Sequence, residues 1–255
     1  MMEHEYDVMR RVEDLHWWYA VLRWQVLRVL KRCLPAQGRV LDAGCGTGGM
    51  LALLLRRLSV SEVAGVDASE LAVQHCSRRG LRCVRLGSVN ELPFEDASFD
   101  GVLSLDVLYH SGVDEMRALA EMRRVLKPGG VLVVNLPAFA WLRGIHDDAV
   151  CGDRRYKACQ LRLLLEGHSL RTEMIHYWNA WLFLPLLLWR RLGHFLAAQP
   201  DVESDLMLPP KWLNRLLVCG GKIDAWLCRT FRLPLGSSVF AVAIKEAATS
   251  GGQGT

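Results

Sequence analysis

Acidic and glycine residues that could hold a small polar ligand lie close together in the first third of the chain. Asp42 stands just before the loop Gly44-Cys45-Gly46-Thr47-Gly48-Gly49, and Asp67 follows further along. Glycines in such a loop let the backbone turn sharply and approach a ligand closely. An acid placed like Asp67 can accept hydrogen bonds from both hydroxyls of a ribose. The pattern predicts a nucleotide-like ligand, although the glycine spacing alone also fits a G-x-G-x-x-G dinucleotide site.

The acid before the loop separates two ligand classes. A carboxylate at Asp42 would repel the diphosphate of a dinucleotide. The methionine end of S-adenosylmethionine instead carries an ammonium and a sulfonium, which a carboxylate attracts. Two further segments follow in order, Leu92-Pro93-Phe94 and Leu126-Lys127-Pro128-Gly129-Gly130. These features favour the sulfonium cofactor over a nicotinamide one.

Together these residues resemble the class I S-adenosylmethionine-dependent methyltransferases over residues 38–140. The resemblance implies a Rossmann-like, doubly wound α/β fold with a mostly parallel seven-stranded sheet, strand order 3-2-1-4-5-7-6, strand 7 antiparallel. It also implies S-adenosyl-L-methionine as the cofactor, and we expect no metal. The implied cofactor-binding residues are Asp42, Gly44, Cys45, Gly46, Gly48, Asp67, Ala68, Ser88, Val89 and Leu105.

The elements that must position these residues alternate between apolar strands and amphipathic helices. Such alternation is typical of crossover units around a parallel sheet with helices on both faces. The expected strands are residues 39–42, 62–67, 81–86, 99–105, 131–135, 170–177 and 237–244. The expected helices of this core are residues 50–58, 70–79, 114–126 and 158–166.

A first helix is predicted over residues 9–34, where apolar residues recur at spacings of three and four. His16, Tyr19 and Arg23 share one face of that helix. In the methyltransferases that the chain resembles, a helix here closes over the cofactor, which makes Tyr19 and Arg23 candidate cofactor contacts. The alternative is a packed aromatic helix with a solvated arginine.

Methyl transfer needs a base only when the acceptor must lose a proton, so the candidate catalytic residues are few. His146 stands beside Asp147, and Arg155 and Tyr156 follow in a stretch that resembles a bacterial subgroup of the family acting on small molecules. His110 comes just after the fourth strand. The candidate catalytic residues are therefore His146, His110, His16 and Tyr156, each with a structural role as the alternative.

The chain divides into four expected parts: an N-terminal helical cap (1–37), the core (38–177 and 237–246), an apolar helical insertion or lid (178–236) and a disordered tail (247–255). The most apolar stretch, residues 178–189, is too short to span a membrane, which takes about 20 apolar residues. The insertion can roof the acceptor site, form a dimer interface or rest on a membrane.

Composition narrows the functional classes. The net charge of +4 is small and scattered, so we expect no nucleic-acid partner. The eight cysteines form no C-x-x-C pair and are typical of a reducing compartment, so we expect a cytoplasmic protein. The predicted function is methyl transfer to an oxygen or nitrogen of a small-molecule or peptide acceptor, with a bulky apolar acceptor if the insertion is a roof. The alternatives are a membrane-surface enzyme for a lipid-linked acceptor and a silent cofactor-binding scaffold. The chain is expected to have no transmembrane span and to be a monomer or homodimer.

Overall fold

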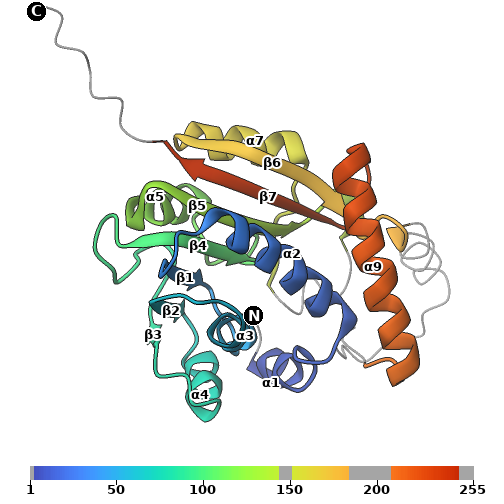
Figure 1. The fold of residues 1–255 in the computed structure, drawn as a ribbon, viewed down its shortest axis with the longest axis horizontal. Helices are drawn as coiled ribbons and strands as arrows, with labels where there is room; N and C mark the ends of the chain where they lie inside the picture. Colours follow the sequence, from blue (N-terminus) through green and yellow to red (C-terminus); the bar gives the residue numbers. More distant parts are fainter. Residues whose placement is uncertain (1–2, 144–150, 184–207, 247–255) are drawn as a thin grey trace, which may run out of the picture.

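A seven-stranded sheet forms the centre of the molecule in the computed structural model, which describes residues 3–143, 151–183 and 208–246 (Figure 1). The strand order is β3-β2-β1-β4-β5-β7-β6. The strands are β1 (Arg39–Ala43), β2 (Glu62–Asp67), β3 (Val84–Leu86), β4 (Phe99–Leu105), β5 (Leu126–Pro137), β6 (Leu170–Trp178) and β7 (Ser238–Lys245). β7 pairs antiparallel with both β5 and β6, and the other pairs are parallel. The predicted strand order and directions are confirmed.

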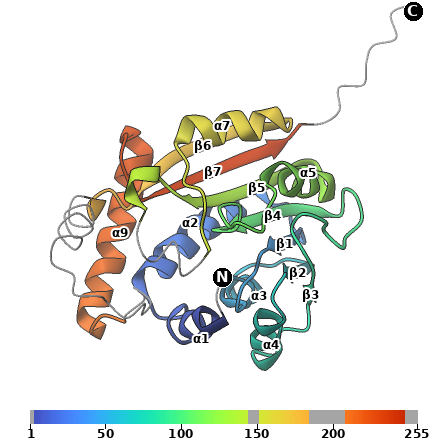
Figure 2. The same ribbon diagram turned by 180° about the vertical axis from the view of Figure 1, so that it is seen from behind.

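Helices cover both faces of the sheet, as the apolar strands require. α5 (Glu115–Val125) and α7 (Ala158–Gly167) pack on one face, and α2 (Trp17–Cys33) and α3 (Gly49–Arg57) on the other (Figures 1 and 2). Successive residues of β4 supply the two cores alternately, since Val102 packs with α5 and Leu103 with α2 and α3. The sheet is therefore buried on both faces, and this packing fixes the position of the carboxyl end of each strand.

Side-chain caps set the starts of two core helices. α4 (Glu70–Arg78) begins after Ser69, whose hydroxyl accepts the backbone N–H of Ala72, and α5 begins after Asp114, whose carboxylate accepts the N–H groups of Met116 and Arg117. Such caps satisfy N–H groups that have no partner within the helix. They place each helix directly after the loop at the carboxyl end of the preceding strand.

The single N-terminal helix expected over residues 9–34 is wrong. The chain forms α1 (Glu3–Val12), turns, and starts α2 at Trp17 with His16 as its cap. A tertiary contact holds the corner, because the Asn214 side chain accepts the N–H of Trp17 and donates to the carbonyl of Leu15. Apolar periodicity continues across the turn, so the sequence pattern could not show it. The turn folds α1 back across the carboxyl ends of the strands.

The described part of the expected insertion is dominated by one helix, α9 (Lys211–Phe231), which packs against α2 and β6. Trp178, the first residue of that expected part, is the last residue of β6 and fully buried. The stretch 184–207 lies outside the described residues. No helix in the part of the chain that the structure describes is long and apolar enough to cross a membrane.

Candidate functional site

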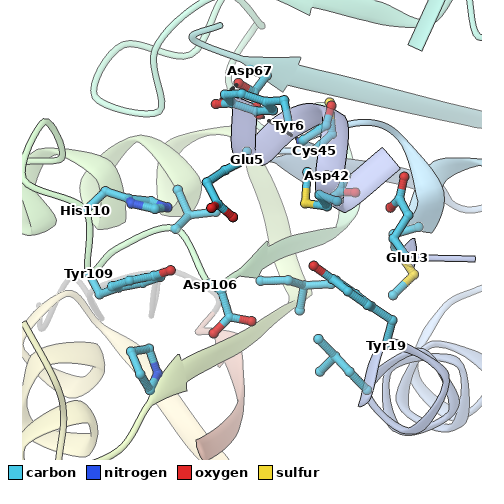
Figure 3. Close-up of a pocket in the computed structure, with 18 of the residues that line it drawn as sticks. Glu5, Tyr6, Glu13, Tyr19, Asp42, Cys45, Asp67, Asp106, Tyr109 and His110 are labelled. Carbon is cyan, nitrogen blue, oxygen red and sulfur yellow. Dashed lines mark hydrogen bonds between the residues drawn. The ribbon is translucent and has the colours of Figure 1, made fainter. Parts of the chain in front are cut away.

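A cavity of about 600 Å³ opens at the carboxyl ends of β1, β2 and β4, and α1 and the start of α2 form its roof (Figure 3). In parallel α/β sheets this edge is where ligands bind, because loops leave the strands there in opposite directions. The cavity brings together residues from the first helix to β7. The fold therefore assembles one site from segments that are distant in sequence.

The glycine loop forms the floor of this cavity. Gly44 has a φ of +88°, a conformation that a side chain rarely adopts, and its N–H donates to the carbonyl of Val66 at 2.8 Å. A Cβ on Gly44 would overlap the side chain of Val107. The glycine lets the loop turn away from β1 and leaves room for the chain after β4.

Gly49, the last glycine of the loop, serves a different contact from the one its dinucleotide-like spacing suggests. A Cβ at this position would overlap the guanidinium of Arg23 and the carboxylate of Glu13. These two side chains form a buried ion pair at 3.1 Å, and Glu13 also accepts hydrogen bonds from Thr47 and Arg79. We refer to Glu13, Arg23, Arg79 and Thr47 as the clasp. The clasp ties the α1–α2 corner to the glycine loop and to α4.

Asp67 lies at the end of β2, where its carboxylate is fixed by backbone donors. It accepts hydrogen bonds from the N–H of Gly46 at 2.8 Å and of Ser69 at 3.0 Å, and the Tyr6 hydroxyl donates at 3.5 Å. Burial raises the pKa of Asp67, while the backbone donors and the Tyr6 hydroxyl oppose that rise. The side chain is thereby oriented toward the cavity and accessible to a ligand's hydroxyl groups.

Asp42, at the end of β1, is almost completely buried beside the loop. Burial raises its pKa to about 7, and the charges of Asp67 and Glu13 add to the rise, whereas Arg23 opposes it. A buried carboxylate with this pKa is costly to ionise alone. A cation in the cavity would stabilise its charged form.

Asp106, which sequence analysis did not select, faces the same cavity from the end of β4. Its backbone has a φ of +56°, and its carboxylate accepts hydrogen bonds from the Asn135 amide at 2.9 and 3.1 Å. Asn135 is oriented in turn by the indole N–H of Trp178, which donates to it at 2.9 Å. Burial raises the pKa of Asp106 to about 7, opposed by the Asn135 hydrogen bond and the charge of Arg155. The available signal was an acid at the carboxyl end of an apolar strand, as at Asp42 and Asp67.

Most of the residues expected to bind the cofactor line this cavity. Gly48 is the exception, since it does not border the space directly. The lining residues from that prediction are Asp42, Gly44, Cys45, Gly46, Asp67, Ala68, Ser88, Val89, Leu105, Tyr19 and Arg23. The Ser88 hydroxyl accepts the N–H of Asn90 at 3.1 Å, which fixes the turn after β3. Glu5, Tyr6 and Glu13 were missed, because only the turn after α1 brings them to the cavity.

The candidate catalytic residues have different surroundings. His16 lines the cavity, but its Nδ1 accepts the N–H of Trp18 as the cap of α2, and burial lowers its pKa. His110 lines the cavity and stacks on Tyr109, with ring centroids 4.3 Å apart. Tyr156 is not among the lining residues; its hydroxyl donates to Glu115 at 2.7 Å. His146 lies outside the described residues.

The charges around the cavity favour a cationic ligand. Figure 3 shows carboxylates of Glu5, Glu13, Asp42, Asp67 and Asp106 gathered around one space. The lining arginines are Arg23, which is paired with Glu13 and Asp14, and Arg155, which donates to the carbonyl of Ala138 at 2.9 Å. Several acids in a low-dielectric space attract positive charge and repel a diphosphate. The charges therefore favour S-adenosylmethionine over a dinucleotide, the two cofactor classes that the glycine spacing leaves open.

Comparisons with known proteins agree with S-adenosylmethionine as the cofactor. Residues 41–134 match a family described as a methyltransferase domain. Residues 41–134 therefore carry a methyltransferase domain of the class I S-adenosylmethionine-dependent type. The chain is 42% identical over 99 residues to the phthiotriol/phenolphthiotriol dimycocerosates methyltransferase 1 of Mycobacterium ulcerans, a match that covers 37% of this chain and 36% of that protein. It is 38% identical over 111 residues to the O-methyltransferase cnsE of Penicillium expansum, covering 40% of each.

The fold is also found in solved methyltransferase structures. A SAM-dependent methyltransferase from Thermotoga maritima superposes with a TM-score of 0.58 at 19% identity, covering 95% of this chain and 96% of the other. That likeness concerns the fold. The sequence matches cover less than half the length of these curated relatives.

The residues of this cavity fit S-adenosylmethionine, the cofactor of the family. Asp67 offers a carboxylate to the ribose hydroxyls, and the buried acids around Asp42 complement an ammonium and a sulfonium. The tight turn at Gly44 opens the floor beneath them. The N-terminal clasp then closes the cavity from above.

Proposed function

We propose that this chain transfers the methyl group of S-adenosylmethionine to an oxygen or nitrogen atom of a small-molecule or peptide acceptor. The proposal is carried by the carboxylate of Asp106, which faces the same cavity as Asp42 and Asp67. Asp67 is the last residue of β2, Asp42 is the residue before the last of β1, and Asp106 directly follows β4; the three strands are neighbours in the sheet. Asp42 and Asp67 serve the cofactor, and Asp106 is left for the acceptor.

The chemistry needs one group that can accept a proton near neutral pH. When bound, S-adenosylmethionine would supply its methyl carbon to the lone pair of an acceptor atom, with the sulfur leaving as neutral S-adenosylhomocysteine. Asp106 accepts the proton that a hydroxyl or ammonium acceptor must lose, and its raised pKa of about 7 suits this role. Asn135 holds the carboxylate in place, so less reorganisation is required.

Aromatic side chains shape the acceptor half of the cavity. In Figure 3 the rings of Tyr19 and Tyr109 approach the middle of the cavity from opposite sides, with the Asp106 carboxylate between them. Trp18 also lines the space and packs on Trp178, with ring centroids 5.4 Å apart. Apolar walls with few polar groups are typical of sites for organic small molecules. They favour an acceptor with an apolar or aromatic body.

The experiment uses Asp106→Asn and methyl-labelled S-adenosylmethionine with a small-molecule extract of the source cells as the acceptor pool. The expected result is formation of S-adenosylhomocysteine and labelled product by the unmodified chain. Asp106→Asn should lower the rate about 100-fold or more, the range of lost general-base catalysis, with cofactor affinity changed less than about twofold. The rate of the unmodified chain should rise with pH up to about 7, where Asp106 ionises, and then level off.

Asp100→Asn is the matched control, because Asp100 pairs with Lys127 outside the cavity lining. It should keep both the rate and the pH profile. A chain that binds S-adenosylmethionine but forms no S-adenosylhomocysteine with extract or with a peptide digest would be a silent scaffold, and the proposal would be abandoned. An Asp106→Asn rate equal to that of the unmodified chain would remove Asp106 from the proposed role.

A further inference from the structure

The helix α9 presents its large apolar side chains to solvent. Trp212, Leu216, Ile223 and Trp226 are 66%, 61%, 59% and 48% exposed. Their spacings of four, seven and three residues place them in one row along the helix. We refer to these four residues as the apolar row. Monomeric soluble proteins rarely expose such a continuous apolar surface without a partner.

The opposite face of α9 is small and polar, which fixes the helix in this orientation. Its buried residues are Gly221, Asp224, Ala225 and Cys228. Gly221 lies against Val21 of α2, where a Cβ would come within 2.8 Å of a methyl group. The Asp224 carboxylate accepts hydrogen bonds from the backbone N–H groups of residues 179–181 at 2.6 to 3.2 Å. Rotating α9 to bury the apolar row would break these contacts.

A row of cations runs beside the apolar row. Lys211, Arg215, Lys222 and Arg229 follow each other at spacings of four, seven and seven residues, which places them along one edge of the helix. The one acid between Lys211 and Phe231 is Asp224, and it is buried. The exposed surface of α9 therefore combines apolar side chains, two of them tryptophan, with positive charge and no exposed acid.

We infer that the outer face of α9 binds the surface of an anionic lipid bilayer. Tryptophan rings favour the boundary between headgroups and acyl chains, and lysine and arginine beside them are attracted by anionic headgroups. A second copy of the chain fits this face less well, because a two-fold contact with the helices antiparallel would bring the four cations against the same four cations. The lipid surface supplies the missing negative charge.

The bound helix would lie next to the wall of the cavity. Asn214 of α9 accepts the N–H of Trp17 at 2.9 Å, and Trp17 and Trp18 both line the cavity. Figures 1 and 2 show α9 at the edge of the molecule alongside α2. Binding through the apolar row would therefore place the start of α2 close to the bilayer surface. This inference does not depend on the proposed methyl transfer, because lipid binding needs neither cofactor nor acceptor.

Flotation of the full chain with vesicles tests the inference. Vesicles of phosphatidylcholine with about one third phosphatidylglycerol should carry the chain, whereas pure phosphatidylcholine vesicles should carry far less, and added salt should weaken binding. Trp212→Ser with Trp226→Ser should reduce partitioning about tenfold or more. Lys211→Gln and Arg215→Gln should each reduce it about fivefold on anionic vesicles alone.

Leu163→Ser with Leu55→Ser is the matched control, because these exposed leucines lie on α7 and α3. This control should leave vesicle binding unchanged, and thermal melting checks that each variant is folded. A second measurement uses Cys219, an exposed residue of α9, labelled with an environment-sensitive dye after Cys151→Ser and Cys159→Ser. Its emission should shift to the blue with anionic vesicles. In a second chain with Cys151→Ser and Cys219→Ser, a dye on Cys159 of α7 should not respond.

Three outcomes would overturn the inference. The first is equal binding to neutral and anionic vesicles. The second is vesicle binding that survives loss of both tryptophans. The third is a dimer, seen by sedimentation, that is lost on replacement of Trp212 and Trp226, together with no binding to vesicles. That result would assign the face to self-association.

Discussion

Three aspartates at the ends of adjacent strands have three different surroundings. Asp67 accepts two backbone N–H groups, Asp42 is buried among other acids, and Asp106 is held by the Asn135 amide. The same type of side chain is therefore a fixed hydrogen-bond acceptor at Asp67, a complement to a cation at Asp42 and, in the proposed function, a proton acceptor at Asp106. Burial raises the pKa of all three, and neighbouring charges and hydrogen-bond donors add to or oppose that rise.

The raised pKa of Asp42 predicts a pH dependence of cofactor binding. A cation stabilises the ionised carboxylate, so the pKa of Asp42 falls on binding and a proton is released below pH 7. Affinity for S-adenosylmethionine should be constant above about pH 7 and fall up to tenfold per pH unit below it. Asp42→Asn should bind at least about tenfold more weakly, with a flat profile, in calorimetric titrations from pH 5.5 to 8.5.

Glu62→Gln is the control for this titration, because Glu62 begins β2 at the opposite edge of the sheet and pairs with Arg39. It should keep the profile of the unmodified chain. A flat profile in the unmodified chain would show that Asp42 does not ionise with binding.

Among the elements, the N-terminal pair of helices has the closest link to the site. The clasp joins α1 and α2 to the glycine loop through a buried ion pair, and Gly49 provides the space for it. Breaking a buried pair leaves an unpaired charge, so the clasp is a strong constraint on where the roof lies. The roof is therefore coupled to the loop that it covers.

Gly49→Ala should destabilise the chain by about 1–3 kcal/mol, because the added methyl group overlaps Glu13 and Arg23. In the background Glu13→Ala with Arg23→Ala, the same change should cost much less. The measurement is the midpoint of urea unfolding for the four chains of this double-mutant cycle. Gly167→Ala, where a Cβ meets nothing within 4 Å, should be close to neutral. Equal costs of Gly49→Ala in both backgrounds would contradict the role assigned to the clasp.

At the scale of the whole molecule, the cavity connects segments from α1 to β7, so a ligand there stabilises the entire fold. The lining runs from Glu5 to Ser238, and the described residues between them supply both faces of the sheet. A ligand that binds only the folded state raises its stability by mass action. The same acids make this stabilisation selective for positive ligands.

S-adenosylmethionine at 100 times its dissociation constant should add about 2.7 kcal/mol of stability, which raises the melting temperature by about 5–10 °C for a chain of this size. NAD at the same concentration should cause no shift, because its diphosphate meets the carboxylates of the cavity. Differential scanning fluorimetry with both ligands measures this. A comparable shift with NAD would contradict the electrostatic argument.

Local patterns in the sequence determined the sheet and the cofactor side of the site. Apolar runs ending near Asp42 and Asp67, the glycines between them and the later Leu92-Pro93-Phe94 segment are all short-range signals. They carry the family resemblance, and the strand order that the resemblance implies is confirmed. These signals work because strands, turns and caps depend mainly on residues close in the chain. The same signals place the predicted cofactor residues, apart from Gly48, around one cavity.

Only the tertiary structure decided the rest. The break between α1 and α2 depends on Asn214, nearly two hundred residues away. The apolar periodicity continues across the break and therefore did not predict it. The orientation of Asp106 depends on Asn135 and Trp178, and the outward apolar row of α9 depends on the bonds that Asp224 makes with another segment. Each is a contact between distant residues, whose effect on direction and exposure is set by packing rather than by spacing along the chain.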